Sequence, residues 1–210
     1  MIKTENTPIA EKELSTEEKI LAAARSVFTK KGMFGARMQD IADEAGINKA
    51  LLHYYFRSKE KLFDRIFEEA SNKMFSVLNS IIADEKLSVM EKIKDLIENY
   101  INMAIANPYI PAFVMSEANQ NPDFIKEHLI KKISVHKQLI THIQEAISLG
   151  EIKPTNPVQL FMNVMSLAVF PFIVRPIFQA GFGVADEQFN ALMEQRKKHL
   201  VEFIMAAIKP

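Results

Sequence analysis

The sequence has no cysteine and no tryptophan, and only six of its 210 residues are glycine. Without cysteine the chain cannot form a disulfide, a cysteine-ligated metal site or a thiol nucleophile. The HExxH, GxSxG and glycine-rich phosphate-binding motifs are also missing from the sequence. We therefore expect no catalytic residues and no cofactor, and a helical enzyme is the weakest hypothesis for its function.

The spacing of the histidines disfavours a metal site. His128, His136 and His142 fall in one segment expected to be helical, at separations of eight and six residues. Two ligands on one helix need a separation of three or four residues to share a face. The sequence therefore predicts no metal site.

Long apolar runs are absent as well. The most apolar stretch, residues 160–174, has about fifteen residues, is interrupted by Pro171 and is followed by Arg175, whereas a membrane-spanning helix needs about 20. Residues 1–14 are polar and charged, without the apolar core of a signal peptide. We expect a cytoplasmic protein that does not enter the membrane, with residues 1–14 as a flexible arm.

Neither sign of charge is in excess, because 26 Lys and Arg balance 26 Asp and Glu. The distribution is uneven, however, since residues 15–63 hold nine Lys or Arg against six Asp or Glu. A local excess of this kind suits contact with a DNA backbone, and a dimer would present it twice.

Strand-like alternation and internal repeats are missing, while apolar residues recur at helical spacing along most of the chain. This pattern predicts an all-α fold of about nine helices. We expect a small three-helix unit over residues 15–60 and a larger helical unit over residues 61–210.

Residues 39–56, QDIADEAGINKALLHYYF, have the pattern of two short helices joined by a tight turn. Gly46 can adopt the left-handed conformation that ends a helix, and Asn48 can cap the helix that follows. Two short helices joined in this way indicate a helix-turn-helix, whose second helix can enter the major groove of DNA.

These residues also resemble a known family. The segments AAARSVFTKKG (residues 22–32), IADEAGI (41–47) and LLHYYFRSKEKLF (51–63) are similar to the DNA-binding domain of the TetR family of bacterial transcription regulators. Ala36 and Arg37 depart from the family pattern, which usually has a Thr or Ser pair there, and the second helix loses a hydroxyl cap. His53 and Tyr54 also differ from the usual Tyr and His, so the resemblance implies no particular operator sequence.

The expected DNA contacts lie in the two helices of this motif and at the start of the next helix. Lys49 can reach a guanine edge or a phosphate, Ala50 permits close approach, and His53 and Tyr54 can donate to phosphates. Taken singly, each of them is also what an ordinary solvated helix carries. The complete set is Arg37, Gln39, Asn48, Lys49, Ala50, Leu51, His53, Tyr54 and Lys59.

The larger unit is expected to begin with a long amphipathic helix of about 25 residues, which links it to the small unit. Its last two helices are expected near residues 157–180, with a kink at Pro171, and 186–207. The first is apolar all round and must be covered on both sides. The family resemblance implies that these two helices form a four-helix bundle with a second copy, although a monomeric core helix is the plainer alternative.

The resemblance also implies that a small molecule binds between the helices of the larger unit. Aromatic and methionine side chains can line such an adaptable apolar pocket, although they are more often ordinary core. The candidates are Tyr100, Met103, Phe113, Phe161, Met165 and Phe172.

Two hypotheses for the function follow. The first is a homodimeric repressor that binds a palindromic double-stranded DNA operator and is released by a small, hydrophobic effector. In the alternative, a DNA-bound dimer answers to a protein partner, and a larger unit packed without a cavity would favour it.

Overall fold

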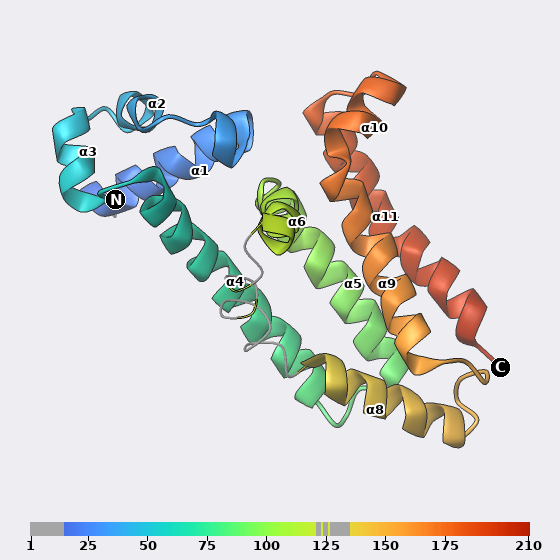
Figure 1. Cartoon of the computed structure of the whole chain (residues 1–210). Coiled ribbons are helices and arrows are strands. Elements are labelled where there is room, and N and C mark those ends of the chain that lie inside the picture. The colour runs from blue at the N-terminus through green and yellow to red at the C-terminus, as the bar shows by residue number, and fades with distance from the viewer. Residues whose placement is uncertain (1–14, 121–122, 124–125, 127–134) are drawn as a thin grey trace, which may run out of the picture. The chain divides into compact units, whose positions relative to one another are not determined.

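The computed structural model describes residues 15–120, 123, 126 and 135–210, so the expected N-terminal arm lies outside the described residues. This described part contains ten helices and no strand, which confirms the all-α fold (Figure 1). Contacts divide the chain into one unit that ends at Phe63 and a second that runs from Asp64 to Pro210. No single described helix is both long and apolar enough to cross a membrane, and only the bent pair of helices Pro157–Ile173 and Arg175–Phe182 is long and apolar enough when the two are joined.

The first unit consists of three helices and the first turn of a fourth. They are α1 (Thr16–Gly35), α2 (Met38–Glu44), α3 (Lys49–Tyr55) and the start of α4 (Lys59–Ala83). Ser15 and Glu18 form a capping box that begins α1, with N–H to side-chain oxygen distances of 2.8 and 3.2 Å. The buried core of this unit includes Ile20, Ala24, Val27, Phe28, Ile41, Ala42, Leu52, Leu62 and Phe63.

The second unit is built around a central helix. It contains the rest of α4 and α5 (Val89–Ala106), α6 (Ile110–Gln120), α8 (Val135–Ser148), α9 (Pro157–Ile173), α10 (Arg175–Phe182) and α11 (Asp186–Ile208). The backbone of α5 packs against α8, α9 and α11, and Figure 1 shows α5, α9 and α11 side by side. Aliphatic residues from one face of α5 (Val89, Ile93, Ile97, Ile101 and Ala104) form the middle of this core.

A buried lysine fastens the end of α4 to two other helices. The Lys92 side chain of α5 is in the core, and its Nζ donates to the Ile82 carbonyl at 2.9 Å. The same Nζ lies 3.2 Å from Nδ1 of His142 on α8. Since the last carbonyls of a helix lack partners within the helix and carry its negative end, a cation there satisfies both needs.

The segment expected as one kinked helix over residues 157–180 is two helices, and this expectation was wrong. The bend between α9 and α10 is 65°, and it occurs at Val174 (φ −97°, ψ 16°) rather than at Pro171, which stays inside α9. Pro176 explains the position of the break, because it has no N–H to continue the hydrogen bonds of α9. This division adds a helix to the about nine that the sequence predicted.

Candidate nucleic-acid interface and cavity

The turn between α2 and α3 has the geometry that its sequence predicted. Gly46 has a φ of 67°, and the Ile47 N–H donates to the Ala42 carbonyl at 3.0 Å, which closes the end of α2. Asn48 caps α3, because its Oδ1 accepts from the Leu51 N–H at 2.8 Å. The turn thus sets the direction in which α3 leaves α2.

Two carboxylates hold α2 against α1. Glu44 accepts from Ser26 Oγ at 2.7 Å and from Lys30 Nζ at 3.2 Å, and these two hydrogen bonds hold the pKa of Glu44 below its ordinary value. Asp40 pairs with Lys31 Nζ at 3.0 Å, and this hydrogen bond is the main reason why the pKa of Asp40 is also lowered. Both carboxylates therefore stay ionised near neutral pH, so the brace is intact there.

One face of α3 is buried and the opposite face is exposed. Leu52 is fully buried, whereas Lys49, Ala50, His53 and Tyr54 are exposed at spacings of one and four residues, which place them on one side of the helix. The Tyr54 side chain is 82% exposed, so it does not serve the core. This face has the polar and aromatic groups that a DNA-reading helix needs.

Several expected contact residues already have partners within the unit. Gln39 Nε2 donates to Asp43 Oδ1 at 2.8 Å, and Lys59 Nζ donates to the Phe34 carbonyl at 3.4 Å. His53 Nδ1 lies 3.2 Å from the Arg57 carbonyl. Because a carbonyl can only accept, Nδ1 must carry the proton that it donates there, and Nε2 is the ring nitrogen left for a contact with DNA.

The two remaining candidates differ in exposure. Arg37 is exposed and occupies the N-cap position of α2, where its side chain makes no capping hydrogen bond. Leu51 is 37% exposed, at the border between the two faces of α3. Arg37 is therefore well placed for a phosphate, while the Leu51 side chain is only partly exposed.

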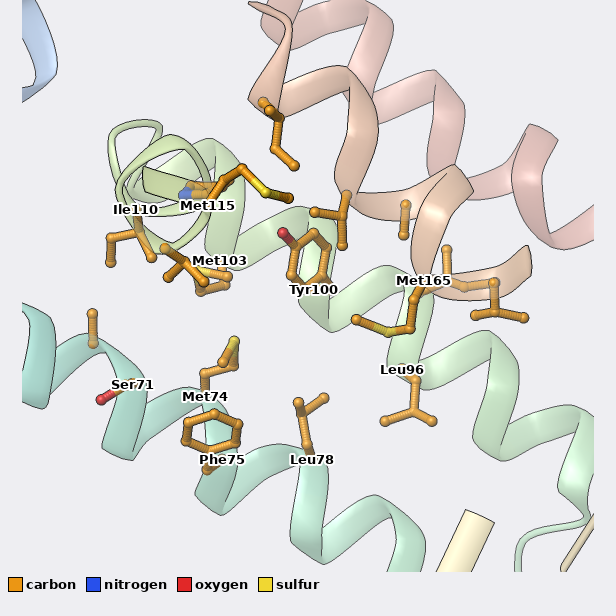
Figure 2. Close-up of a pocket in the computed structure, with 18 of the residues that line it drawn as sticks. Ser71, Met74, Phe75, Leu78, Leu96, Tyr100, Met103, Ile110, Met115 and Met165 are labelled. Carbon is orange, nitrogen blue, oxygen red and sulfur yellow. The ribbon is translucent and has the colours of Figure 1, made fainter. Parts of the chain in front are cut away.

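The second unit contains a cavity of about 280 Å³ between α4, α5, α6, α8 and α9. Figure 2 shows side chains from these helices facing a common space, with Met74 and Leu78 on α4, Tyr100 on α5, and Met165 on α9. The volume is just below the range of roughly 300–1,000 Å³ that is typical of ligand pockets. The site could therefore hold a compact molecule.

Four of the six expected pocket residues line this cavity, namely Tyr100, Met103, Phe161 and Met165. Phe113 and Phe172 do not line it and are buried in the core instead. The centre of the Phe113 ring lies 5.5 Å from that of Phe67, and the centre of the Phe172 ring lies 6.4 Å from that of Tyr100, and both partners line the cavity. Both phenylalanines thus support the walls from behind.

The α4 wall of the cavity was missed among the expected pocket residues. It includes Phe67, Ala70, Ser71, Met74, Phe75 and Leu78. Most of these residues belong to the apolar stripe that predicted the long helix. Helical spacing shows that such a stripe is covered, but not whether a neighbouring helix or an open space covers it.

Only two side chains on the described wall of the cavity carry a polar group, Ser71 and Tyr100. Ser71 Oγ donates to the Glu68 carbonyl of its own helix at 3.1 Å. The Tyr100 hydroxyl has no hydrogen-bond partner among the described residues, and burial raises the pKa of Tyr100. The phenol therefore stays protonated and able to donate.

Within the described ranges, no three His, Asp or Glu side chains come together as metal ligands. Of the three histidines weighed in the sequence, His142 is directed at Lys92, and His128 lies outside the described residues.

The two units match two parts of one protein family. Residues 20–66 match the family model of the bacterial regulatory proteins of the tetR family, and residues 90–204 match that of the tetracyclin repressor-like C-terminal domain. The chain belongs to the TetR family. It is therefore a DNA-binding transcription regulator, while the DNA contacts of its individual residues stay predictions.

Relatives within the TetR family agree with this assignment. The chain is 25% identical to the biofilm operon icaADBC negative transcriptional regulator IcaR of Staphylococcus epidermidis, over 85% of this chain and 94% of that protein. It is 32% identical to the transcriptional repressor NicS of Pseudomonas putida, over 50% of this chain and 48% of that protein.

Solved TetR-family structures share the fold. The ketosteroid transcriptional regulator KstR2 of Mycobacterium tuberculosis aligns with a TM-score of 0.72 at 16% identity, covering 96% of this chain and 99% of that one. A mutant of the HlyIIR protein aligns with a TM-score of 0.63 at 20% identity, covering 92% of this chain and 97% of that one. At these identities the likeness speaks for the fold alone.

Proposed function

We propose that this TetR-family chain is a homodimeric repressor whose grip on a palindromic operator is released by a small hydrophobic molecule. One observation carries the proposal: side chains of α4 line the cavity, and α4 is the same unbroken helix that begins in the DNA-binding unit with Lys59. A molecule that binds in the cavity and shifts α4 would act on the DNA-binding unit through this one rigid helix.

The cavity favours a small molecule over a protein partner as the effector. A partner protein would need an exposed surface, whereas the side chains of the cavity are almost all apolar and come from five helices of one unit. The side chains that line an empty cavity lack van der Waals partners on that side. A ligand that fills the cavity supplies these contacts, and they contribute to its binding free energy. IcaR is described as a negative regulator and NicS as a repressor, which supports repression rather than activation of transcription.

A dimer is supported by apolar side chains on the outer faces of two adjacent helices. Met162 and Phe170 on α9 are 52% and 54% exposed, and Leu192 and Phe203 on α11 are 47% and 58% exposed. Large apolar groups of this kind rarely stand together in water without a partner surface. In a symmetric dimer the two copies of α3 would enter successive major grooves about 34–36 Å apart.

The test is selection of binding sites by the full chain from a random-sequence DNA pool at moderate salt. We expect a palindrome of two half-sites. Lys49→Ala removes a base contact from each of the two half-sites, so it should weaken binding to the selected palindrome by at least roughly thirtyfold. Lys86→Ala, an exposed lysine in the second unit, is the matched control and should bind as the parent chain does.

Binding without sequence preference, or equal binding by Lys49→Ala, would contradict the operator part of the proposal. The effector part fails separately, if the chain selects a palindrome but no small molecule that binds the cavity changes the affinity for it.

A further inference from the structure

The described wall of the cavity has no charged side chain. Every lining residue is aliphatic, aromatic, methionine or proline, apart from the hydroxyl groups of Ser71 and Tyr100. A charged ligand would lose its hydration on entry without gaining a counter-ion from these side chains, which is strongly unfavourable. This wall therefore selects against carboxylates, phosphates and ammonium groups.

Tyr100 is the one polar group on this wall that is left for a ligand. The Ser71 hydroxyl donates a hydrogen bond to the Glu68 carbonyl, while the Tyr100 hydroxyl has no hydrogen-bond partner within the part of the chain that the structure describes. In Figure 2 the Tyr100 oxygen is at the end of the ring that points away from Leu78, toward the part of the cavity formed by Met115. A hydroxyl held among apolar side chains without a partner gains from any ligand atom that completes its hydrogen bond.

Methionines give the rest of the wall an adaptable shape. Each of four helices contributes one to the cavity: Met74 from α4, Met103 from α5, Met115 from α6 and Met165 from α9. An unbranched, polarisable side chain can repack around ligands of different outline. Selectivity is then set by the single polar point and by the volume, more than by a fixed shape.

We propose that the effector is an uncharged, largely apolar, compact molecule with one hydroxyl or carbonyl oxygen that forms a hydrogen bond with the Tyr100 hydroxyl. This inference rests on the proposed function, in which the cavity is the regulatory site, and it names the chemical class that the site takes. Ring compounds with a phenolic or keto oxygen and medium-length alcohols both belong to this class.

Three probes with one ring skeleton separate charge from hydrogen bonding: naphthalene, 2-naphthol and 2-naphthoate. Binding of each to the full chain is measured by calorimetry. We expect 2-naphthol to bind most tightly, naphthalene more weakly and 2-naphthoate not measurably. Tyr100→Phe should weaken 2-naphthol about tenfold, as for one lost hydrogen bond, and leave naphthalene unchanged.

Two further variants locate the site. Tyr109→Phe is the matched control, because Tyr109 is a buried tyrosine of the same unit that does not line the cavity, and it should bind all probes as the parent chain does. Ala70→Leu fills part of the cavity from α4 and should weaken naphthalene and 2-naphthol alike.

The possible failures are distinct. Tighter binding of 2-naphthoate than of 2-naphthol, or no binding of any probe, overturns the proposed chemical class, and equal 2-naphthol affinity in Tyr100→Phe overturns the role of Tyr100. The proposed function is tested by adding the bound probe to the operator complex. If 2-naphthol binds as expected but leaves operator affinity unchanged, the chemical class stands and the regulatory role of the cavity fails.

Discussion

Arg196 compensates for a hydrogen bond that Pro171 removes from its own helix. Pro171 has no N–H to donate to the carbonyl four residues earlier, that of Leu167. Arg196 of α11 donates to this carbonyl from Nη2 at 2.8 Å and from Nε at 3.2 Å. Burial lowers the pKa of the Arg196 guanidinium, but an arginine stays charged at any physiological pH. One residue thus ties α11 to α9 at the point where α9 is weakest.

Most of the stability lost on replacing Arg196 should depend on the presence of Pro171. Arg196→Met leaves the Leu167 carbonyl without a partner, and we expect the free energy of unfolding to fall by about 1–3 kcal/mol. In a Pro171→Ala background the helix can supply its own N–H to that carbonyl, so the same replacement should cost much less. Urea unfolding of the four proteins at one protomer concentration measures this double-mutant cycle.

The exposed Lys198 provides the control for this cycle. Its side chain is 85% exposed, so Lys198→Met should change the free energy of unfolding by no more than about 0.5 kcal/mol. If Arg196→Met cost the same in the parent chain and in the Pro171→Ala background, the carbonyl would not be the reason for the cost, and the packing of the arginine stem would be.

Helix α2 begins with a charged residue instead of a side-chain cap. Arg37 is its N-cap residue and makes no side-chain cap, whereas Ser15, Asn48 and Ser88 all cap their helices through a side-chain oxygen. Arg37→Ser should therefore stabilise the first unit by roughly 0.5–1 kcal/mol. It should also weaken operator binding and reduce the slope of log affinity against log salt by about 2, because each of the two protomers loses one phosphate contact.

Arg37→Ala separates the two effects in this prediction. Alanine removes the charge without providing a cap, so it should weaken operator binding as serine does and leave the unit no more stable than before. Thermal unfolding and operator binding at several salt concentrations measure both quantities. A serine variant with unchanged salt dependence would show that Arg37 does not contact a phosphate.

Local chemistry explains why the elements were predictable from the sequence and why the cavity was only partly so. Ser15 with Glu18, Gly46 and Asn48 act within a few residues of themselves, so their roles can be read without the fold. Phe113 and Phe172 could not be told from pocket residues, because aromatic side chains have the same pattern whether they face a space or another ring. The break at Val174 required a choice between Pro171 and Pro176, which depends on how α10 packs.

We expect the whole molecule to be a dimer in which the exposed apolar side chains of α9 and α11 contact a second copy of the chain. Phe203→Glu places a charge within the proposed dimer contact, where it would be buried without a counter-ion. We expect the mass in solution, measured by light scattering, to fall from that of two chains to that of one. The control is Leu149→Glu. Leu149 directly follows α8 and is 74% exposed, so this change should leave the dimer intact.

Loss of the dimer should also abolish tight operator binding although α3 is untouched. Two linked half-sites bind with an avidity that exceeds either affinity by roughly 10²–10⁴, so a monomeric Phe203→Glu should retain only the weak binding of a single α3. Its affinity for an isolated half-site should equal that of the parent chain. If Phe203→Glu stayed dimeric, the interface would lie elsewhere on the second unit. If it became monomeric but still bound the full palindrome tightly, the two recognition helices would not act together, and the dimeric mode of operator recognition would be wrong.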